Sequence, residues 1–174
     1  GARPTQHLDM CLFNRGEYTR ALAENNLVEV ISQVLYPEDS HEQGKILRLK
    51  QQYFFVSASI QSIVRQFKKN GNNLSDFADK NVIHINDTHP SLAIPELMRI
   101  LLDEGMTWDE AWQIVSRTFA YTNHTIMHEA LEKWPVALFK RVLPQISCIV
   151  EEINERFCRS LWKLYPEDWQ RISE

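Results

Sequence analysis

Three polar clusters in this sequence carry side chains that can do chemistry. They are Asp39-Ser40-His41, Asp87-Thr88-His89, and Asn123-His124 together with His128. Carboxylate, hydroxyl and imidazole groups can bind polar ligands, ligate metals or move protons. Each cluster lies in a predicted loop or at the end of a predicted element, where functional residues concentrate. These clusters are therefore the candidate site.

Two interpretations are open for the cluster at residues 87–89. The carboxylate of Asp87 and the imidazole of His89 can be offered to a ligand, to a metal or to each other. Alternatively, Asp87 or Thr88 caps the following turn and His89 makes a local hydrogen bond. Spacing alone favours this second, structural interpretation.

His124 and His128 are four residues apart, like the two histidines of a helical zinc site. Glu129 follows the second histidine, so it cannot occupy the general-base position between them. A catalytic zinc site also needs a third protein ligand. A metal-dependent hydrolase is therefore the least favoured function, and no metal is expected.

Hydrophobic periodicity predicts that helices position these clusters. Apolar residues recur at helical spacing over residues 17–35 and 45–69. Ser91 is a plausible cap for a helix over residues 91–104, and Thr107 with Glu110 forms a capping-box pattern for a helix that reaches about residue 119. Breaks at Pro135 and Pro144 precede a helix over residues 145–165.

Residues 81–86 are short and β-branched, which predicts a buried strand that ends at a polar loop. Open α/β sheets present ligand sites at the carboxyl ends of their strands. One strand cannot form a sheet, so its partners are either unrecognised here or outside this chain. The second alternative is favoured, because residues 120–126 are expected to be irregular or briefly extended.

Aromatic and basic residues offer two further patterns. The five tryptophans could form a platform for sugar stacking, but their helical spacing among apolar residues favours core packing for most of them. They are Trp108, Trp112, Trp134, Trp162 and Trp169. The basic run from Arg65 to Lys69 could bind an anion, although a solvated helix end explains it equally well.

Composition is typical of a globular domain. The chain has 174 residues, of which 44% are apolar and 24% charged, with a net charge of −4. There is no basic footprint for nucleic acid and no apolar run that could cross a membrane. Cys148 and Cys158 are predicted to share one helix about 15 Å apart, too far for a disulfide. Reduced thiols favour a cytoplasmic protein.

Motifs in register along nearly the whole chain resemble those of α-glucan (glycogen, starch and maltodextrin) phosphorylases. The strongest motifs are NDTHPSLAIPELMR at residues 86–99, FAYTNHT at 119–125 and EALEKWP at 129–135. Further motifs are FNRGEY at 13–18, VLYP at 34–37 and GKILRLKQ at 44–51.

The resemblance implies an α/β, strongly α-rich fold. Residues 1–174 would be one partial domain, an internal piece of the amino-terminal Rossmann-like domain of a two-domain (GT-B) glycosyltransferase, with few strands of its own. The reaction implied is phosphorolysis, in which orthophosphate releases terminal α-1,4-linked glucose as glucose 1-phosphate. The implied cofactor is pyridoxal phosphate, and the parent enzyme would be a homodimer.

Matching positions imply roles for the candidate residues. His124 would lie against the glucosyl unit in the catalytic pocket, largely through its backbone, and Asp87, His89 and Asn123 would bind substrate in the same cleft. The loop at residues 37–43 corresponds to a mobile gate with Asp39 as its main polar contact. Tyr36 would lie near the bound glucan.

The family's cofactor lysine and its glycine-rich phosphate loop do not appear, so this chain alone is expected to be inactive and to expose surfaces that missing strands cover. Gln66 follows Arg65 where animal enzymes carry two adjacent arginines. Together with a short segment after Lys69, this indicates an unregulated bacterial-type enzyme that is insensitive to AMP. The competing hypothesis is a non-catalytic helical module that binds glucan or a protein.

Overall fold

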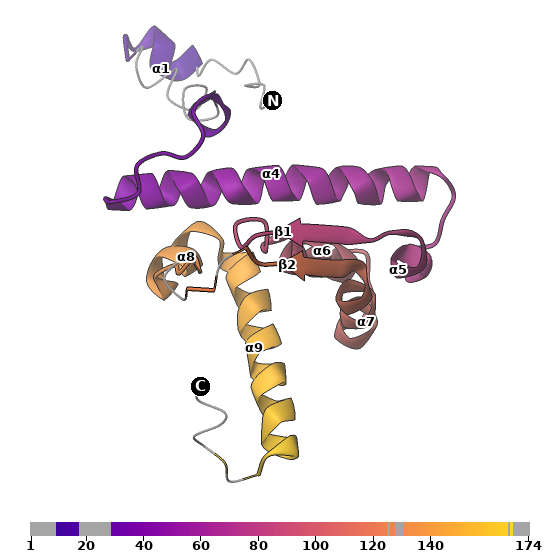
Figure 1. The fold of residues 1–174 in the computed structure, drawn as a ribbon. Helices are drawn as coiled ribbons and strands as arrows, with labels where there is room; N and C mark the ends of the chain where they lie inside the picture. Colours follow the sequence, from indigo (N-terminus) through magenta and orange to yellow (C-terminus); the bar gives the residue numbers. More distant parts are fainter. Residues whose placement is uncertain (1–9, 18–28, 125, 128–130, 167, 169–174) are drawn as a thin grey trace. The chain divides into compact units, whose positions relative to one another are not determined.

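A computed structural model describes residues 10–17, 29–124, 126–127, 131–166 and 168. The chain forms two compact units, residues 1–55 and 56–174, which are described separately. The first unit contains α1 (Met10–Asn14), helical residues 29–33 and the beginning of α4 (Glu42–Lys69) (Figure 1). The prediction that residues 1–174 form a single partial domain stays a prediction.

In the first unit, the loop before α4 is held to the start of that helix. The Gly44 amide donates to Nδ1 of His41 at 3.0 Å, so the imidazole satisfies one of the free donors at the helix amino terminus. Arg48 pairs with Asp39 at 3.2 Å. A Cβ on Gly44 would lie 1.8 Å from the carbonyl oxygen of Glu38, so only glycine allows this close approach.

The second unit contains the remaining helices and the strands. In chain order after α4 they are η1 (Leu74–Asp76), α5 (Phe77–Lys80), β1 (Ile83–Asn86), α6 (Ala93–Asp103), α7 (Trp108–Thr118), β2 (Phe119–Thr122), α8 (Val136–Val142) and α9 (Pro144–Leu164). The helix predictions over residues 45–69, 107–119 and 145–165 are confirmed. The short helical turns at residues 74–80 were not predicted.

β1 and β2 form a parallel pair, in which Ile83 aligns with Phe119 and Asn86 with Thr122 (Figure 1). The preference for partner strands outside the chain was therefore wrong for β2. This strand has only four residues and follows α7 without a turn, so it produces no separate periodic signal. A helix-rich α/β chain is confirmed, whereas the two-domain glycosyltransferase fold stays a prediction.

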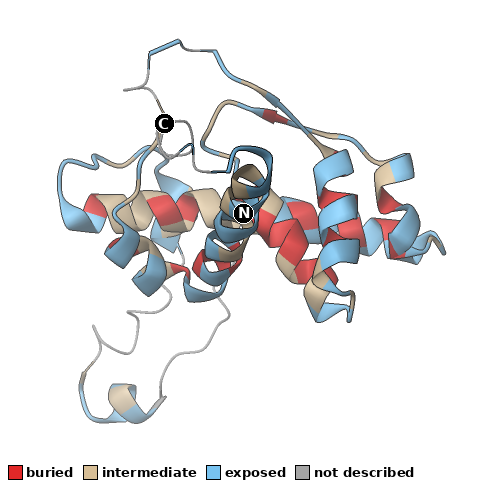
Figure 2. Cartoon of the chain, turned by 90° about the horizontal axis from the view of Figure 1, so that it is seen from below, coloured by how far each residue is buried: buried red, intermediate tan, exposed pale blue. Residues whose placement is uncertain are grey.

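The core of the second unit lies mainly between helices (Figure 2). α6 packs on α7 and α9, while α5 packs on α7 and α8 on α9. Leu97, Met98 and Leu101 of α6 are fully buried, and Ile85 is the buried residue of β1. The phenyl rings of Phe67 and Phe77 meet edge to face at 5.0 Å between centroids.

Two helix starts were predicted, with different outcomes. Thr107 and Glu110 form the capping box, with the Thr107 amide donating to the Glu110 carboxylate at 2.8 Å. Ser91 does not cap α6, because the helix begins at Ala93 with Leu92 at the cap position and no side-chain cap bond. The Ser91 amide instead donates to the carbonyl of Thr88, which extends the turn after β1.

None of the four tryptophans that the structure describes is among the buried core residues, which corrects the packing prediction for them. Trp112 is 38% exposed, Trp108, Trp134 and Trp162 are half-buried, and Trp169 lies outside the described residues. The guanidinium of Arg156 lies 5.0 Å from the ring centroid of Trp108. Both residues line an open pocket of about 390 Å³ between α7 and α9. Long cationic side chains can cover aromatic rings at the surface, which accounts for their contact.

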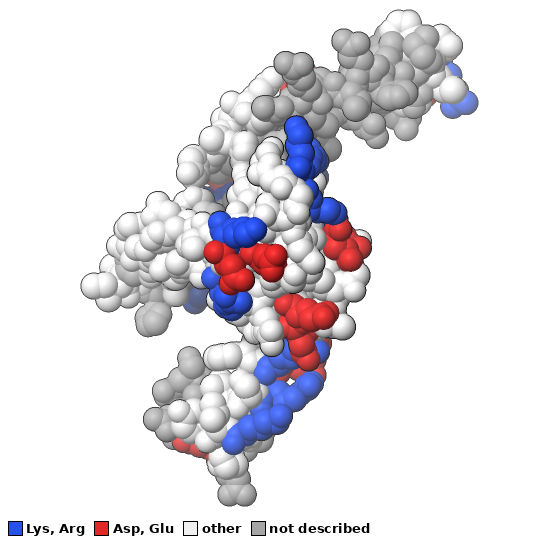
Figure 3. All heavy atoms as spheres, turned by 90° about the vertical axis from the view of Figure 1, so that its right-hand side faces the viewer, with Lys and Arg blue, Asp and Glu red and all other residues white. Residues whose placement is uncertain are grey.

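Acidic and basic side chains are neighbours on the face shown in Figure 3, in keeping with the ion pairs Lys68–Glu104 and Arg156–Asp109. Lys68 lies in the basic run at the end of α4, where Arg65 and Lys69 are also exposed to solvent. Within the described ranges, no helix has the length and apolar character needed to cross a bilayer.

Candidate functional site

The carboxyl ends of β1 and β2 bring two of the predicted polar clusters to one edge of the sheet. The Asp87 amide donates to the carbonyl of Thr122 at 2.9 Å, which extends the strand pairing beyond Asn86. Nε2 of His124 lies 2.5 Å from Oδ1 of Asn86. Because parallel strands end at the same edge, residues 38 positions apart in the sequence become neighbours.

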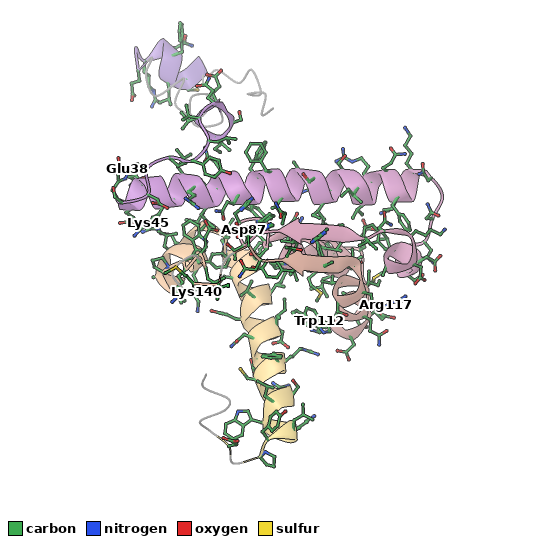
Figure 4. All side chains as sticks on the ribbon, in the orientation of Figure 1. Glu38, Lys45, Asp87, Trp112, Arg117 and Lys140 are labelled. Atoms are coloured by element: carbon green, nitrogen blue, oxygen red, sulfur yellow. The ribbon has the colours of Figure 1, made fainter. Side chains whose placement is uncertain are left out.

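Asp87 has a left-handed backbone conformation at the end of β1, with φ of 69° (Figure 4). Aspartate tolerates this region better than most residues because its short side chain bonds locally. Here Oδ1 of Asp87 accepts the Thr88 amide at 2.7 Å. This bond reaches only the next residue, so the predicted capping of the following turn stays a prediction, and Oδ2 has no hydrogen-bond partner among the described residues. One carboxylate oxygen is available to a ligand.

His89 and Asn123 are exposed in the loops that follow the two strands. The imidazole of His89 makes no hydrogen bond to the part of the chain that the structure describes, so its proposed local bond is absent there. His89 lies in the turn that leads into α6, two residues after Asp87. The strand edge thus gathers Asp87, His89, Asn123 and His124, which is consistent with a shared ligand site.

Tyr36 and Asp39 belong to the first unit. Tyr36 is 74% exposed and has a positive φ of 56°, which is unusual for an aromatic residue. The Asp39 carboxylate accepts a hydrogen bond from Nη1 of Arg48 at 3.2 Å. Asp39 would have to exchange this partner, or share it, to contact a sugar.

The described residues form neither a metal site nor an attachment site for the cofactor. They contain no group of three or more histidine, cysteine, aspartate or glutamate side chains that could hold a metal, and His128 lies outside them. A Schiff-base lysine needs a desolvated setting or a nearby cation, yet no described lysine is buried. The hydrogen bond that Lys140 donates to Glu151 even raises the pKa of Lys140. These residues do not fit the attachment site of pyridoxal phosphate.

Three residues beside the site were missed by the sequence-based site prediction. Asn86 contacts His124, and Nε2 of His84 lies 2.6 Å from Oγ1 of Thr122. The alternation of polar and apolar residues at positions 83–86 placed His84 and Asn86 on one face. Their partners could not be identified without the pairing of β1 with β2.

This chain is similar to known proteins along its whole length. The family model described as carbohydrate phosphorylase matches residues 1–174. A glycogen phosphorylase of Bacillus subtilis is 61% identical over 83% of this chain and 18% of its own length. Glycogen phosphorylase 2 of Dictyostelium discoideum is 51% identical over 98% of this chain and 17% of its own.

The human muscle form of glycogen phosphorylase is 51% identical over 92% of this chain and 20% of its own length. The chain therefore spans about a fifth of the length of these relatives.

Proposed function

This chain belongs to the carbohydrate phosphorylase family, and on that premise we propose that it is part of a glucan phosphorylase. The whole protein would use orthophosphate to release terminal α-1,4-linked glucose as glucose 1-phosphate. The observation that carries the proposal is that Asp87 and His124 both lie at the carboxyl edge of β1 and β2, where the Asp87 amide bonds to Thr122 and the His124 ring contacts Asn86. A chain that spans a fifth of its relatives supplies one wall of such a site, and we propose that it is inactive alone.

The polar groups at this edge suit a sugar ligand. Sugar hydroxyls both donate and accept hydrogen bonds, and the edge offers the half-buried carboxylate of Asp87 together with an exposed amide and two exposed imidazoles. We assign His124 to the glucosyl unit at which cleavage occurs. Asp87, His89 and Asn123 would bind the neighbouring sugars. Asp87 and His89 lie in the loop that follows β1, and Asn123 immediately precedes His124 in the loop that follows β2.

The loop at residues 37–43 is proposed to act as the gate over this site. Its contacts with α4 include a part-buried hydrogen bond from the Gly44 amide to His41 and an exposed ion pair between Asp39 and Arg48. Such contacts can break at little cost when a loop moves. Tyr36, exposed beside the gate, would contact the glucan.

Pyridoxal phosphate would be held by parts of the whole protein outside this chain, and its phosphate would supply proton transfer with the substrate phosphate. The role of this chain's residues is to bind and orient the glucan. We further propose a cytoplasmic homodimer without AMP control. Free thiols at Cys11, Cys148 and Cys158 support the location, and Gln66 beside Arg65 supports the lack of control.

The test is phosphate-dependent release of glucose 1-phosphate from an α-1,4-glucan by the full-length protein that contains this chain. His124→Ala should lower kcat/KM by about 10- to 100-fold, the loss expected for one or two hydrogen bonds to the ligand. His84→Ala is the matched control, because it removes an exposed histidine from the same sheet outside the proposed site.

Two results would contradict the proposal. Equal losses in His124→Ala and His84→Ala would show that the sheet, rather than the site, was damaged. No release by an intact, cofactor-loaded wild-type protein would favour the non-catalytic binding module instead.

A further inference from the structure

Two hydrogen bonds of the same pattern cross from β1 to the second strand and the residues that follow it. His84 contacts Thr122 at 2.6 Å, and Asn86 contacts His124 at 2.5 Å. His84 is aligned with Ala120 and Asn86 with Thr122, so each contact reaches two residues beyond the aligned partner. The two contacts form a diagonal ladder on the sheet.

The ladder lies on the polar face of the sheet. Side chains two residues apart on a strand share a face, so His84 and Asn86 point to the opposite side from Ile85. Ile85 is 3% exposed, whereas His84, Asn86 and His124 are all exposed. The same face therefore carries one histidine inside the proposed site and one outside it.

We propose that Asn86 is a positioning residue for His124, holding its imidazole through the amide oxygen at a fixed orientation and in the Nε2–H tautomer. The inference rests on the proposed function, in which His124 contacts the glucosyl unit. It adds a residue that does not itself touch the substrate.

The tautomer follows from the chemistry of the contact. An amide oxygen accepts hydrogen bonds and cannot donate them, so the hydrogen between Oδ1 of Asn86 and the ring belongs to Nε2. In a neutral imidazole the other nitrogen, Nδ1, is then an acceptor. Without Asn86 the ring could rotate and exchange tautomers, and only a fraction of the population would present Nδ1 to a ligand.

The backbone that carries the side-chain amide of Asn86 is held against β2. Asn86 is the last residue of β1 and is aligned with Thr122. The next amide, that of Asp87, donates to the Thr122 carbonyl at 2.9 Å. A side chain anchored in this way can fix a partner that lies beyond the end of β2.

The first test observes the ring directly in the full-length protein labelled with ¹⁵N-histidine. Imidazole nitrogen shifts distinguish the two tautomers, and the His124 signals are assigned by their loss in His124→Gln. The wild type should show Nε2–H, and Asn86→Leu should show a mixture of tautomers. A wild-type ring with its hydrogen on Nδ1, or an unchanged ring in Asn86→Leu, would overturn the inference.

The second test separates positioning from stability through activity. Asn86→Leu should lower kcat/KM about 10-fold. Asn86→Asp keeps the acceptor and should restore most of this loss, while its carboxylate favours the imidazolium. The acid limb of its pH profile should therefore move to higher pH, because the neutral ring forms only above the raised pKa.

Thr122→Val is the matched control, because it removes the other rung of the ladder and keeps a β-branched residue in β2. It should leave kcat/KM and the pH profile unchanged. A loss equal to that of Asn86→Leu would assign the ladder a structural role only. If the wild type releases no glucose 1-phosphate, the proposed function fails, while the nitrogen shifts still decide whether Asn86 fixes the ring.

Discussion

Arg99 holds the buried carboxylate of Glu96 with two parallel hydrogen bonds. Nε donates to Oε2 at 2.9 Å and Nη2 donates to Oε1 at 2.8 Å. The side chain of Glu96 has no exposed surface, and Ser57 of α4 donates a further hydrogen bond to Oε1 at 2.8 Å. The hydrogen bond from Ser57 to Glu96 joins α4 to α6, the helix that follows the loop after β1, so an intact Glu96–Arg99 pair matters for the position of that loop.

Replacement of Arg99 by methionine should strongly destabilise α6. The Glu96 carboxylate would remain buried without its cation, which typically costs about 3–5 kcal/mol. The free energy of local opening, measured by native-state hydrogen exchange of the α6 amides in the full-length protein, should fall accordingly. Asp103→Asn is the control, since Asp103 binds the same guanidinium from an exposed position. Similar effects for the two variants would mean that burial of Glu96 is not the cause.

Substitutions at Asp87 should separate backbone strain from ligand binding. In Asp87→Ala the residue keeps a Cβ at φ of 69° but loses the side-chain acceptor that makes this conformation tolerable, which costs about 1–2 kcal/mol. Asp87→Asn keeps both the tolerance of this conformation and an acceptor for the Thr88 amide, so hydrogen exchange around β1 should match the wild type. Its kcat/KM should nevertheless fall, because the charged oxygen is lost. Full activity in Asp87→Asn would exclude a role for the charge.

Gly44→Ala should displace the loop at residues 37–43 from the start of α4. The added Cβ would lie 1.8 Å from the backbone oxygen of Glu38, so the loop must move away, and Gly44 would lose its hydrogen bond with His41. Amide exchange of residues 38–44, measured by mass spectrometry, should accelerate about 10-fold or more. Gln43→Ala changes an exposed neighbour and should leave exchange unaltered. Slow exchange in Gly44→Ala would show that the loop tolerates the clash.

The capping box of α7 should make a pH-dependent contribution to stability. In the folded protein, hydrogen bonds from the Thr107 hydroxyl and amide lower the pKa of Glu110 below its ordinary value of 4.5. A carboxylate whose pKa is lower in the folded than in the unfolded protein stabilises the fold at pH values above its unfolded pKa. This contribution disappears as the pH falls through the folded pKa. The stability difference between wild type and Glu110→Gln, followed by exchange of the α7 amides, should therefore shrink below about pH 4.5.

Asp76→Asn is the control for that experiment, because the carboxylate of Asp76 makes no side-chain cap bond to α5. The stability difference between Asp76→Asn and the wild type should vary less over the same pH range. An equal pH dependence for both variants would argue against the capping box as the source.

Local sequence patterns were sufficient to predict most helices and one strand. The apolar repeat over residues 45–69 and the Thr107–Glu110 pattern describe interactions within a few turns of one helix, so no distant residue is needed to interpret them. The motifs at residues 86–99 and 119–125 indicated the family, which the comparisons confirmed. Residue types alone also singled out Asp87 and His124 as candidates.

Only the tertiary structure determined that β2 pairs with β1, that Asn86 faces His124, and that Glu96 is buried while Trp112 is exposed. The strands are separated in sequence by α6 and α7, and their register depends on how those helices pack. A four-residue strand carries too little periodicity to specify a partner 36 residues away. Its pairing is decided by long-range packing, because the chain must close that loop before either strand gains a hydrogen bond.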